Sequence, residues 1–257
     1  MPIFKLTLVT LFARKAWFFV LFAAILLPLT LPYLTPHETN IRLLEPARAQ
    51  VAWSVAWFVA ILWTFSSAAR LGEANARTGL GAYFRSRGVG RFRQMLEIWL
   101  GCMVYLLPLV AVTVAVCLTT AMPQMDGEAS MWVTTNLQFA LLFLLAVAPL
   151  ALLCIALGSR FGAMVGYVVP LTLCLYGLYG VNYLGMMIRL PGENALLEWI
   201  YAVSPHYHLA DLTPRLVFKL GSLPTETFGT LLTYFLGVTL VVATCSTTLF
   251  RTEPLKA

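Results

Sequence analysis

Long apolar segments constrain this chain more than any other feature of its sequence. The stretch from Ala16 to Leu34 contains no charged residue, and a helix needs about 20 consecutive apolar residues to cross the hydrocarbon core of a bilayer. Of the 257 residues, 60% are hydrophobic and 11% are charged, whereas soluble domains use about 45–50% apolar and 25% charged residues. A soluble core cannot bury this excess, so we expect an all-α integral membrane protein.

The apolar segments predict six transmembrane helices after a short amphipathic one. Residues 1–15 place Phe4, Leu8, Leu11 and Phe12 at helical spacing, which predicts a helix lying at the membrane interface. A six-helix domain over residues 16–257 follows. Its first apolar run is longer than the 7–15 residues typical of a signal peptide, so we expect it to stay in the protein. The six expected spans are about 16–34, 49–69, 95–121, 132–157, 163–181 and 228–250.

The distribution of lysine and arginine predicts the orientation of these spans. Twelve of the 17 cations lie at the two termini and in the connections after the second and fourth spans. The other five lie in the remaining connections, together with eight of the eleven acidic residues. Because cytoplasmic connections are enriched in lysine and arginine, both termini are expected in the cytosol.

Ionisable residues are missing from the middle of every expected span. Proton pumps and ion-coupled carriers usually keep such residues at membrane depth as a relay or coupling site. The sequence also has no His-Glu-x-x-His motif for an intramembrane zinc protease and no Gly-x-x-x-x-Gly-Lys-Ser/Thr loop for ATP. The five cysteines lie in apolar segments, as small buried hydrophobic residues do. We therefore expect a protein that is not an enzyme, with no catalytic residue, metal or cofactor of its own, that takes its energy from a separate chain.

The connection between the second and third spans, residues 70–94, is the most distinctive polar segment. It holds six of the twelve cations, and its residues 72–86 predict a short helix along the membrane. Two interpretations are open. Arginines near the third span are expected to bind anionic lipid headgroups, at about 1 kcal/mol per cation. The helix itself is expected to dock into a cytosolic protein, with Tyr83 and Phe84 as anchors and arginines supplying charge complementarity.

Taken together, these features resemble one known family. The amphipathic N-terminal segment, the six spans, the long basic first cytosolic connection, the short second one and the extended outer segment are similar to permeases of the second class of ATP-binding-cassette (ABC) exporters. In that family the first cytosolic connection is the coupling helix. Glu73 with Thr78-Gly79 resembles its acidic residue and following Gly-Thr pair, here in the order Thr-Gly. The ATPase-coupling residues expected from both arguments are Glu73, Arg77, Thr78, Gly79, Tyr83, Phe84 and Arg85.

The resemblance implies a permease subunit in a bacterial cytoplasmic (inner) membrane that exports a substrate. Two separate ABC ATPase subunits would bind ATP and Mg, and a second permease copy or homologue would complete a dimer. Membrane lipid is an expected partner and nucleic acid is not. The first alternative is a membrane anchor or regulatory subunit that does not transport. An intramembrane enzyme and a channel or secondary carrier are further alternatives.

Two helix faces are candidates for lining a transport pathway. Tyr176 belongs to a polar and aromatic face of the fifth span, and Trp57 to a similar face of the second span. The resemblance implies that spans two and five of two permeases meet around the pathway. The alternative for the outermost aromatic residues, Trp53 and Tyr183, is an interfacial aromatic belt. The candidate pathway-lining residues are Trp57, Thr64, Thr172, Tyr176 and Tyr179.

The outer connection between the last two spans, residues 182–227, is expected to form a short helix dipping into the membrane before Ser204-Pro205. His206, His208 and Asp211 follow this break. Two histidines two residues apart diverge by about 200° on a helix, and no third strong ligand is near in sequence. We therefore favour a structural segment over a metal site there.

Small residues recur where the fourth span turns into the fifth. Gly158, Gly162 and Gly166 are four residues apart, a spacing that lets helices approach closely. We expect Gly162 and Gly166 to share one helix.

Overall fold

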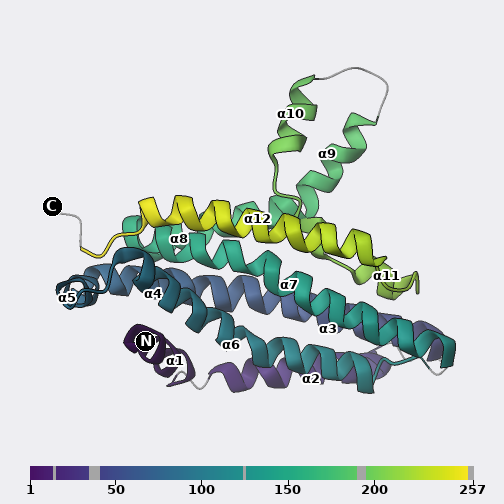
Figure 1. Cartoon of the computed structure of the whole chain (residues 1–257). Helices are drawn as coiled ribbons and strands as arrows, with labels where there is room; N and C mark the ends of the chain where they lie inside the picture. Colours follow the sequence, from purple (N-terminus) through teal and green to yellow (C-terminus); the bar gives the residue numbers. More distant parts are fainter. Residues whose placement is uncertain (14–15, 35–40, 124–125, 190–194, 254–257) are drawn as a thin grey trace.

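The computed structural model describes residues 1–13, 16–34, 41–123, 126–189 and 195–253, and all regular structure in these ranges is helical (Figure 1). The expected all-helical fold is therefore confirmed for this part of the chain. The elements in chain order are α1 Pro2–Ala13, α2 Ala16–Leu34, α3 Ile41–Val59, η1 Ala60–Phe65, α4 Ser66–Arg77, α5 Leu80–Ser86, α6 Arg91–Thr119, α7 Asp126–Phe161, α8 Ala163–Leu175, η2 Tyr176–Gly180, α9 Val181–Ile188, α10 Ala195–Val203, η3 Tyr207–Ala210, α11 Thr213–Val217 and α12 Thr225–Leu249.

Five helices are long and apolar enough to cross a membrane, and they coincide with the second to sixth expected spans. They cover Leu44–Arg77, Arg91–Thr119, Gly127–Phe161, Ala163–Ile188 and Thr225–Leu249. The chain is therefore a multi-pass helical membrane protein. α2, Ala16–Leu34, coincides with the first expected span. The crossing of the membrane by the first expected span and the cytosolic position of the termini stay predictions.

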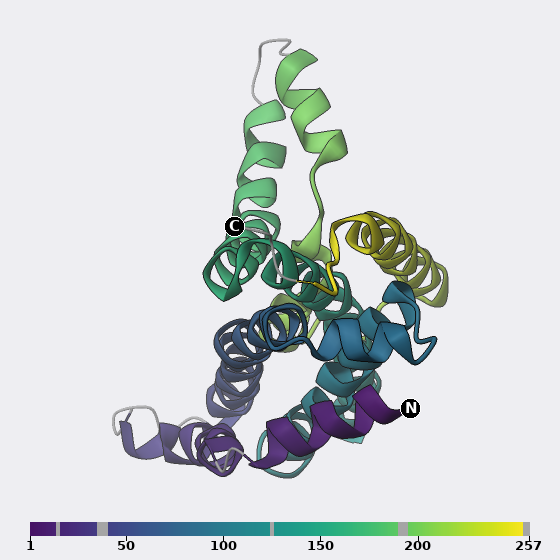
Figure 2. The ribbon, with the colours of Figure 1, turned by 90° about the vertical axis from the view of Figure 1, so that its left-hand side faces the viewer.

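The long helices lie side by side around α7, and the α9–α10 pair projects from the side of this bundle (Figures 1 and 2). α7 packs against α4, α6, α8 and α12. In the apolar segment of α7, 78% of the residues are buried, whereas in the apolar segment of α12 only 6% are. α7 is thus the internal helix of the protomer, whereas α12 packs on it with one face and exposes the rest.

Glycines bring the backbones of α4, α7 and α8 into direct contact. A Cβ added at Gly72 of α4 would collide with the carbonyl oxygen of Ile155, and one at Gly158 of α7 with the carbonyl oxygen of Ala69. A Cβ at Gly166 of α8 would lie 2.5 Å from the backbone nitrogen of Gly158. The close contact across the α7–α8 turn therefore joins Gly158 to Gly166.

Gly162 has a different role from the other two glycines. It forms the turn between α7 and α8 with φ of 94°, a left-handed conformation that favours glycine. The regular spacing of the three glycines therefore reflects one turn and one interhelical contact. Gly162 precedes α8 as its N-cap, so only Gly166 lies within the helix.

α1 is attached to the bundle through a buried carboxylate. Glu97 of α6 accepts hydrogen bonds from the backbone N–H groups of Ile3 and Phe4 at 3.0 and 3.2 Å, and from Arg93 at 3.0 Å. These N–H groups belong to the first turn of α1, where no intrahelical acceptor is available. The carboxylate therefore caps α1. The helix buries Ile3, Thr7 and Leu11, a face rotated from the one predicted by the apolar spacing.

Replacing Gly158 by alanine tests the close contact of α4 and α7. The methyl group has no room against Ala69, and overpacking of this kind costs about 1–3 kcal/mol. We expect a lower thermal midpoint for the purified protein in detergent. Gly127→Ala is the matched control, because a Cβ at Gly127 meets nothing within 4 Å. Equal midpoints for the two variants would show that the α4 and α7 backbones do not touch.

Candidate functional site

The candidate site lies at one end of the bundle, where α4, α5 and the start of α6 meet the α7–α8 turn and residues 250–253. We call it the α5 end. α4 continues the span-two helix to Arg77, and the chain then turns at Gly79, whose φ is 77°. α5 begins one residue later. The single helix predicted over 72–86 is therefore wrong, because the left-handed turn at Gly79 divides it into the end of a span and a separate short helix.

A buried amide network holds α5 in place. Gln94 of α6 accepts a hydrogen bond from the side chain of Asn75 at 3.2 Å and donates to the carbonyl oxygens of Gly81 at 3.0 Å and Val89 at 2.9 Å. Gln94 is fully buried and Asn75 is 5% exposed. One side chain thus joins the end of α4, α5 and the start of α6. Buried amides without these partners would destabilise the structure.

The expected coupling residues Glu73 and Arg77 face the second connection. They form an ion pair of 2.7 Å, and a Cβ at Gly162 would lie 3.4 Å from Glu73 Oε1 and 3.5 Å from Arg77 Nη2. The pair thus lies beside the α7–α8 turn. Because Arg77 is mostly exposed, the ion pair itself contributes little to stability. Its position brings the first and second expected cytosolic connections together.

The segment after α12 completes the α5 end. The backbone N–H of Arg251 donates to Ser159 Oγ at 2.9 Å, and Glu253 forms an ion pair of 3.1 Å with Arg85. Thr252 is buried, and its carbonyl oxygen would lie 2.6 Å from a Cβ at Gly81. Sequence reasoning missed this segment, since Phe250 to Glu253 carry no recognisable motif. The structure adds it to the site.

The surface of the α5 end is basic, and its exposed aromatic side chains include Tyr83, Phe92 and Phe161. Tyr83 is 52% exposed, and the guanidinium of Arg87 lies 5.4 Å from the centre of its ring. Phe84 packs instead against the core. Of the two predicted anchors, the structure therefore exposes Tyr83 and uses Phe84 to seat α5. Thr78 is also exposed. The exposed arginines around this surface are Arg70, Arg77, Arg85, Arg87, Arg91 and Arg93.

The structure separates the two faces predicted to line a pathway. On span two, Trp57 and Thr64 are buried, and Trp57 packs edge-on against Phe143 of α7 at 4.8 Å. On span five, Thr172 and Tyr179 are exposed. Span two thus uses its aromatic face inside the protomer, whereas span five presents its face outward.

Tyr176, the remaining candidate for the pathway, connects the fifth span to the outer segment. It shares a hydrogen bond of 2.8 Å with Ser204 Oγ. It is also the first residue of η2, and a second π-helical segment, η1, contains Thr64. π-helical turns within longer helices occur frequently at functional sites. Both candidate pathway spans therefore carry one.

Residues of the outer segment around the two histidines form structural hydrogen bonds. The backbone N–H of His206 donates to the Tyr234 hydroxyl at 2.9 Å, and Asp211 accepts from the N–H of Thr213 at 3.0 Å, at the start of α11. Burial lowers the pKa of His208. Within the described ranges no group of three His, Cys, Asp or Glu side chains is placed to hold a metal ion.

No protein-family model, curated protein or solved structure matches the chain. The fold and the geometry of the α5 end are therefore the basis for the function proposed below.

Replacing Gln94 by leucine tests the amide network. The side chain of Asn75 and two carbonyl groups lose a partner, so the free energy of opening around α5 should fall by about 1–3 kcal/mol. Hydrogen exchange of the amides between residues 80 and 90 measures this change.

Gln138→Leu is the matched control for Gln94→Leu. Gln138 bonds the backbone of Leu223 at 3.0 and 2.7 Å, away from α5. Its loss should leave exchange in residues 80–90 unchanged. Equal exchange in both variants would mean that Gln94 does not hold α5.

Proposed function

We propose that the chain is the permease subunit of an ABC exporter, driven by ATPase subunits that are separate chains. The observation that carries the proposal is the α5 end. A short helix presents an exposed tyrosine and a ring of arginines, and buried side chains join that helix to several spans. Such a surface suits docking of an acidic groove on a soluble partner. The side of the membrane follows from the cation distribution, which favours the cytosol.

The packing supports transmission of a push from α5 into the bundle. Gln94 couples α5 to α4 and α6, and α4 touches α7 at Gly72 and Gly158 with no side chain between the backbones. Close backbone contact resists sliding, so a displaced α4 carries α7 and α8 with it. ATP-driven closure of two ATPases would then rock the spans between inward-open and outward-open states.

The dimer and the pathway follow within this proposal. A second permease copy or homologue would face the exposed side of span five, with Thr172 and Tyr179 toward the pathway. The two π-helical segments, η1 and η2, would absorb changes in helix direction. The proposal includes six spans and a bacterial cytoplasmic membrane, and ATP and Mg would bind to the partner.

A membrane anchor that does not transport is the second candidate. The burial of Trp57 and Thr64 favours it, because packing within the protomer covers both side chains. The two candidates differ in whether ATP hydrolysis by the assembly depends on a transported substrate. A substrate-stimulated ATPase supports the exporter, whereas an assembly that lacks turnover supports the anchor.

Replacing Tyr83 by alanine tests the docking surface. Loss of an exposed aromatic anchor commonly costs 2 kcal/mol or more of binding, so ATPase recovery should fall about tenfold or more. The measurement is affinity purification of the tagged chain from native membranes, with mass-spectrometric identification of an ABC ATPase and assay of ATP hydrolysis in the eluate.

Tyr33→Ala is the control for Tyr83→Ala. Tyr33 is 84% exposed and lies in α2, outside the α5 end. This variant should recover as much ATPase as the unmodified chain. If Tyr83→Ala also does so, or if no ABC ATPase is recovered with the unmodified chain, α5 is not a coupling helix.

A further inference from the structure

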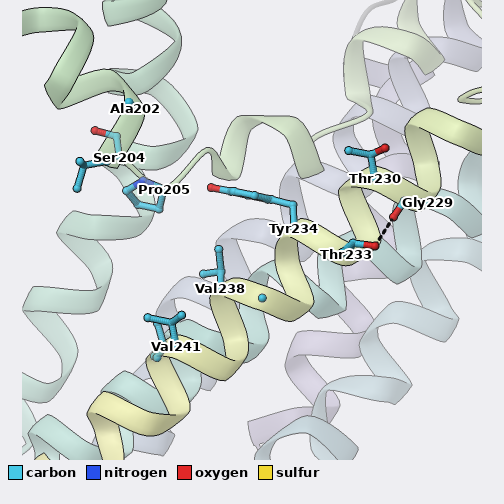
Figure 3. A pocket seen from close by; sticks show the side chains of 12 residues that line it. Ala202, Ser204, Pro205, Gly229, Thr230, Thr233, Tyr234, Val238 and Val241 are labelled. Carbon is cyan, nitrogen blue, oxygen red and sulfur yellow. Dashed lines mark hydrogen bonds between the residues drawn. The ribbon is translucent and has the colours of Figure 1, made fainter.

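A large open groove separates α12 from the end of α10 (Figure 3). Its volume is about 990 Å³, at the upper end of the about 300–1,000 Å³ of small-molecule sites. One wall is the Ser204-Pro205 break, toward which Tyr234 extends from α12 (Figure 3). The other wall is the exposed face of α12. We call the space between these two walls the α10–α12 groove.

The α10–α12 groove changes in polarity along α12. Toward the start of the helix it is lined by the hydroxyl groups of Thr230, Thr233 and Tyr234, and by Ser204 from the opposite wall. Further along, Val238, Val241 and Val242 line it. The Ser204 hydroxyl already donates to the carbonyl oxygen of Ile200 and shares a hydrogen bond with Tyr176, so α12 supplies the hydroxyl acceptors at this end. The other end offers only hydrocarbon, which matches a molecule with a polar head and an apolar chain.

The length of the groove matches one leaflet of a bilayer. From Gly229 to Val242 the helix rises about 20 Å, and one half of the hydrocarbon core is about 15 Å thick. α12 is a candidate membrane span, and only 6% of the residues in its apolar segment are buried within the protein. The groove therefore opens at membrane depth, where lipid is the surrounding solvent.

Glycines give the groove its depth. A Cβ at Gly229 or Gly237 would meet nothing within 4 Å. Packing within the described protomer therefore does not require glycine at either position, although glycine costs a helix about 1 kcal/mol relative to alanine. The open backbone at both positions leaves room for a chain to lie against α12.

The polar end of the groove is unfavourable for an anionic headgroup. Among its described lining residues none is charged. The nearby Thr230 and Thr233 hydroxyls donate to backbone carbonyls in the helix, at 3.0 and 2.9 Å, and so are left as acceptors. An anionic headgroup would find no cation among these residues, whereas a head bearing hydroxyl groups would find acceptors.

We propose that the α10–α12 groove binds a membrane amphiphile with an uncharged, hydroxyl-bearing head and a long hydrocarbon chain. The chain lies along Gly237 to Val242, and the head lies between Ser204 and Thr230. As a candidate cargo site this deepens the proposed export function. Binding itself rests on the lining of the groove and on the membrane position of α12, and it is measured without any ATPase.

Photolabelling of the full chain in proteoliposomes tests the proposal. The probes are a photoactivatable diacylglycerol, with an uncharged head, and a phosphatidylglycerol with the same chains, in a phosphatidylcholine bilayer. Peptide mapping compares the groove side of α12, at Val238 and Val241, with Leu240, which is 69% exposed and outside the groove lining. We expect diacylglycerol labelling to be concentrated at the two valines and stronger than phosphatidylglycerol labelling.

Gly237→Phe is the variant that fills the groove. Its ring should exclude roughly two methylene groups of the chain, lowering labelling at the valines about tenfold. Gly127→Phe is the control, because Gly127 is equally open but lies outside the lining. Labelling unchanged in Gly237→Phe, or equal at Leu240 and the valines, overturns the proposal. A disulfide between two chains carrying Gly237→Cys, with no lipid labelling, would also overturn it and assign the groove to a second copy.

Discussion

The contact of three helix backbones at Gly72, Gly158 and Gly166 organises the rest of the structure. A helix pair in a membrane gains little from hydrophobic burial, because lipid tails are as apolar as side chains. Close packing therefore has to supply the association energy, and glycine lets the backbones approach. α7 becomes the internal helix because α4 and α8 meet it in this way. The α5 end then forms where α4 emerges from that contact.

At the α5 end, buried polar groups hold the helices together, as close glycine contacts do within the bundle. Gln94, Asn75 and Glu97 are buried, and each is paired with a backbone or amide group. A buried unpaired amide is costly, so these hydrogen bonds specify one arrangement of α1, α4, α5 and α6. The surface above them is free to be basic, since its arginines are solvated. A rigid base beneath an exposed helix is the arrangement that the proposed coupling to a partner would require.

The sequence was informative where one physical cause dominated. Hydrophobic length predicted five confirmed long helices, because lipid imposes the same requirement on each. The sequence did not predict contacts between segments that are distant along the chain. Nothing local indicates that Glu97 caps α1 or that Ser159 accepts a hydrogen bond from Arg251. Helical spacing identified the face of span two that contains Trp57. Spacing alone does not show whether such a face packs against α7 or borders open space.

The two sides of α12 have different surroundings. Its inward side packs on α7, so residues such as Phe235 are fixed by protein. Its groove side keeps glycine where alanine would make a better helix and hydroxyl groups where lipid alone would favour leucine. The amphiphile proposed for the groove would lie against the open backbone at the glycines and meet the hydroxyl groups at its polar end.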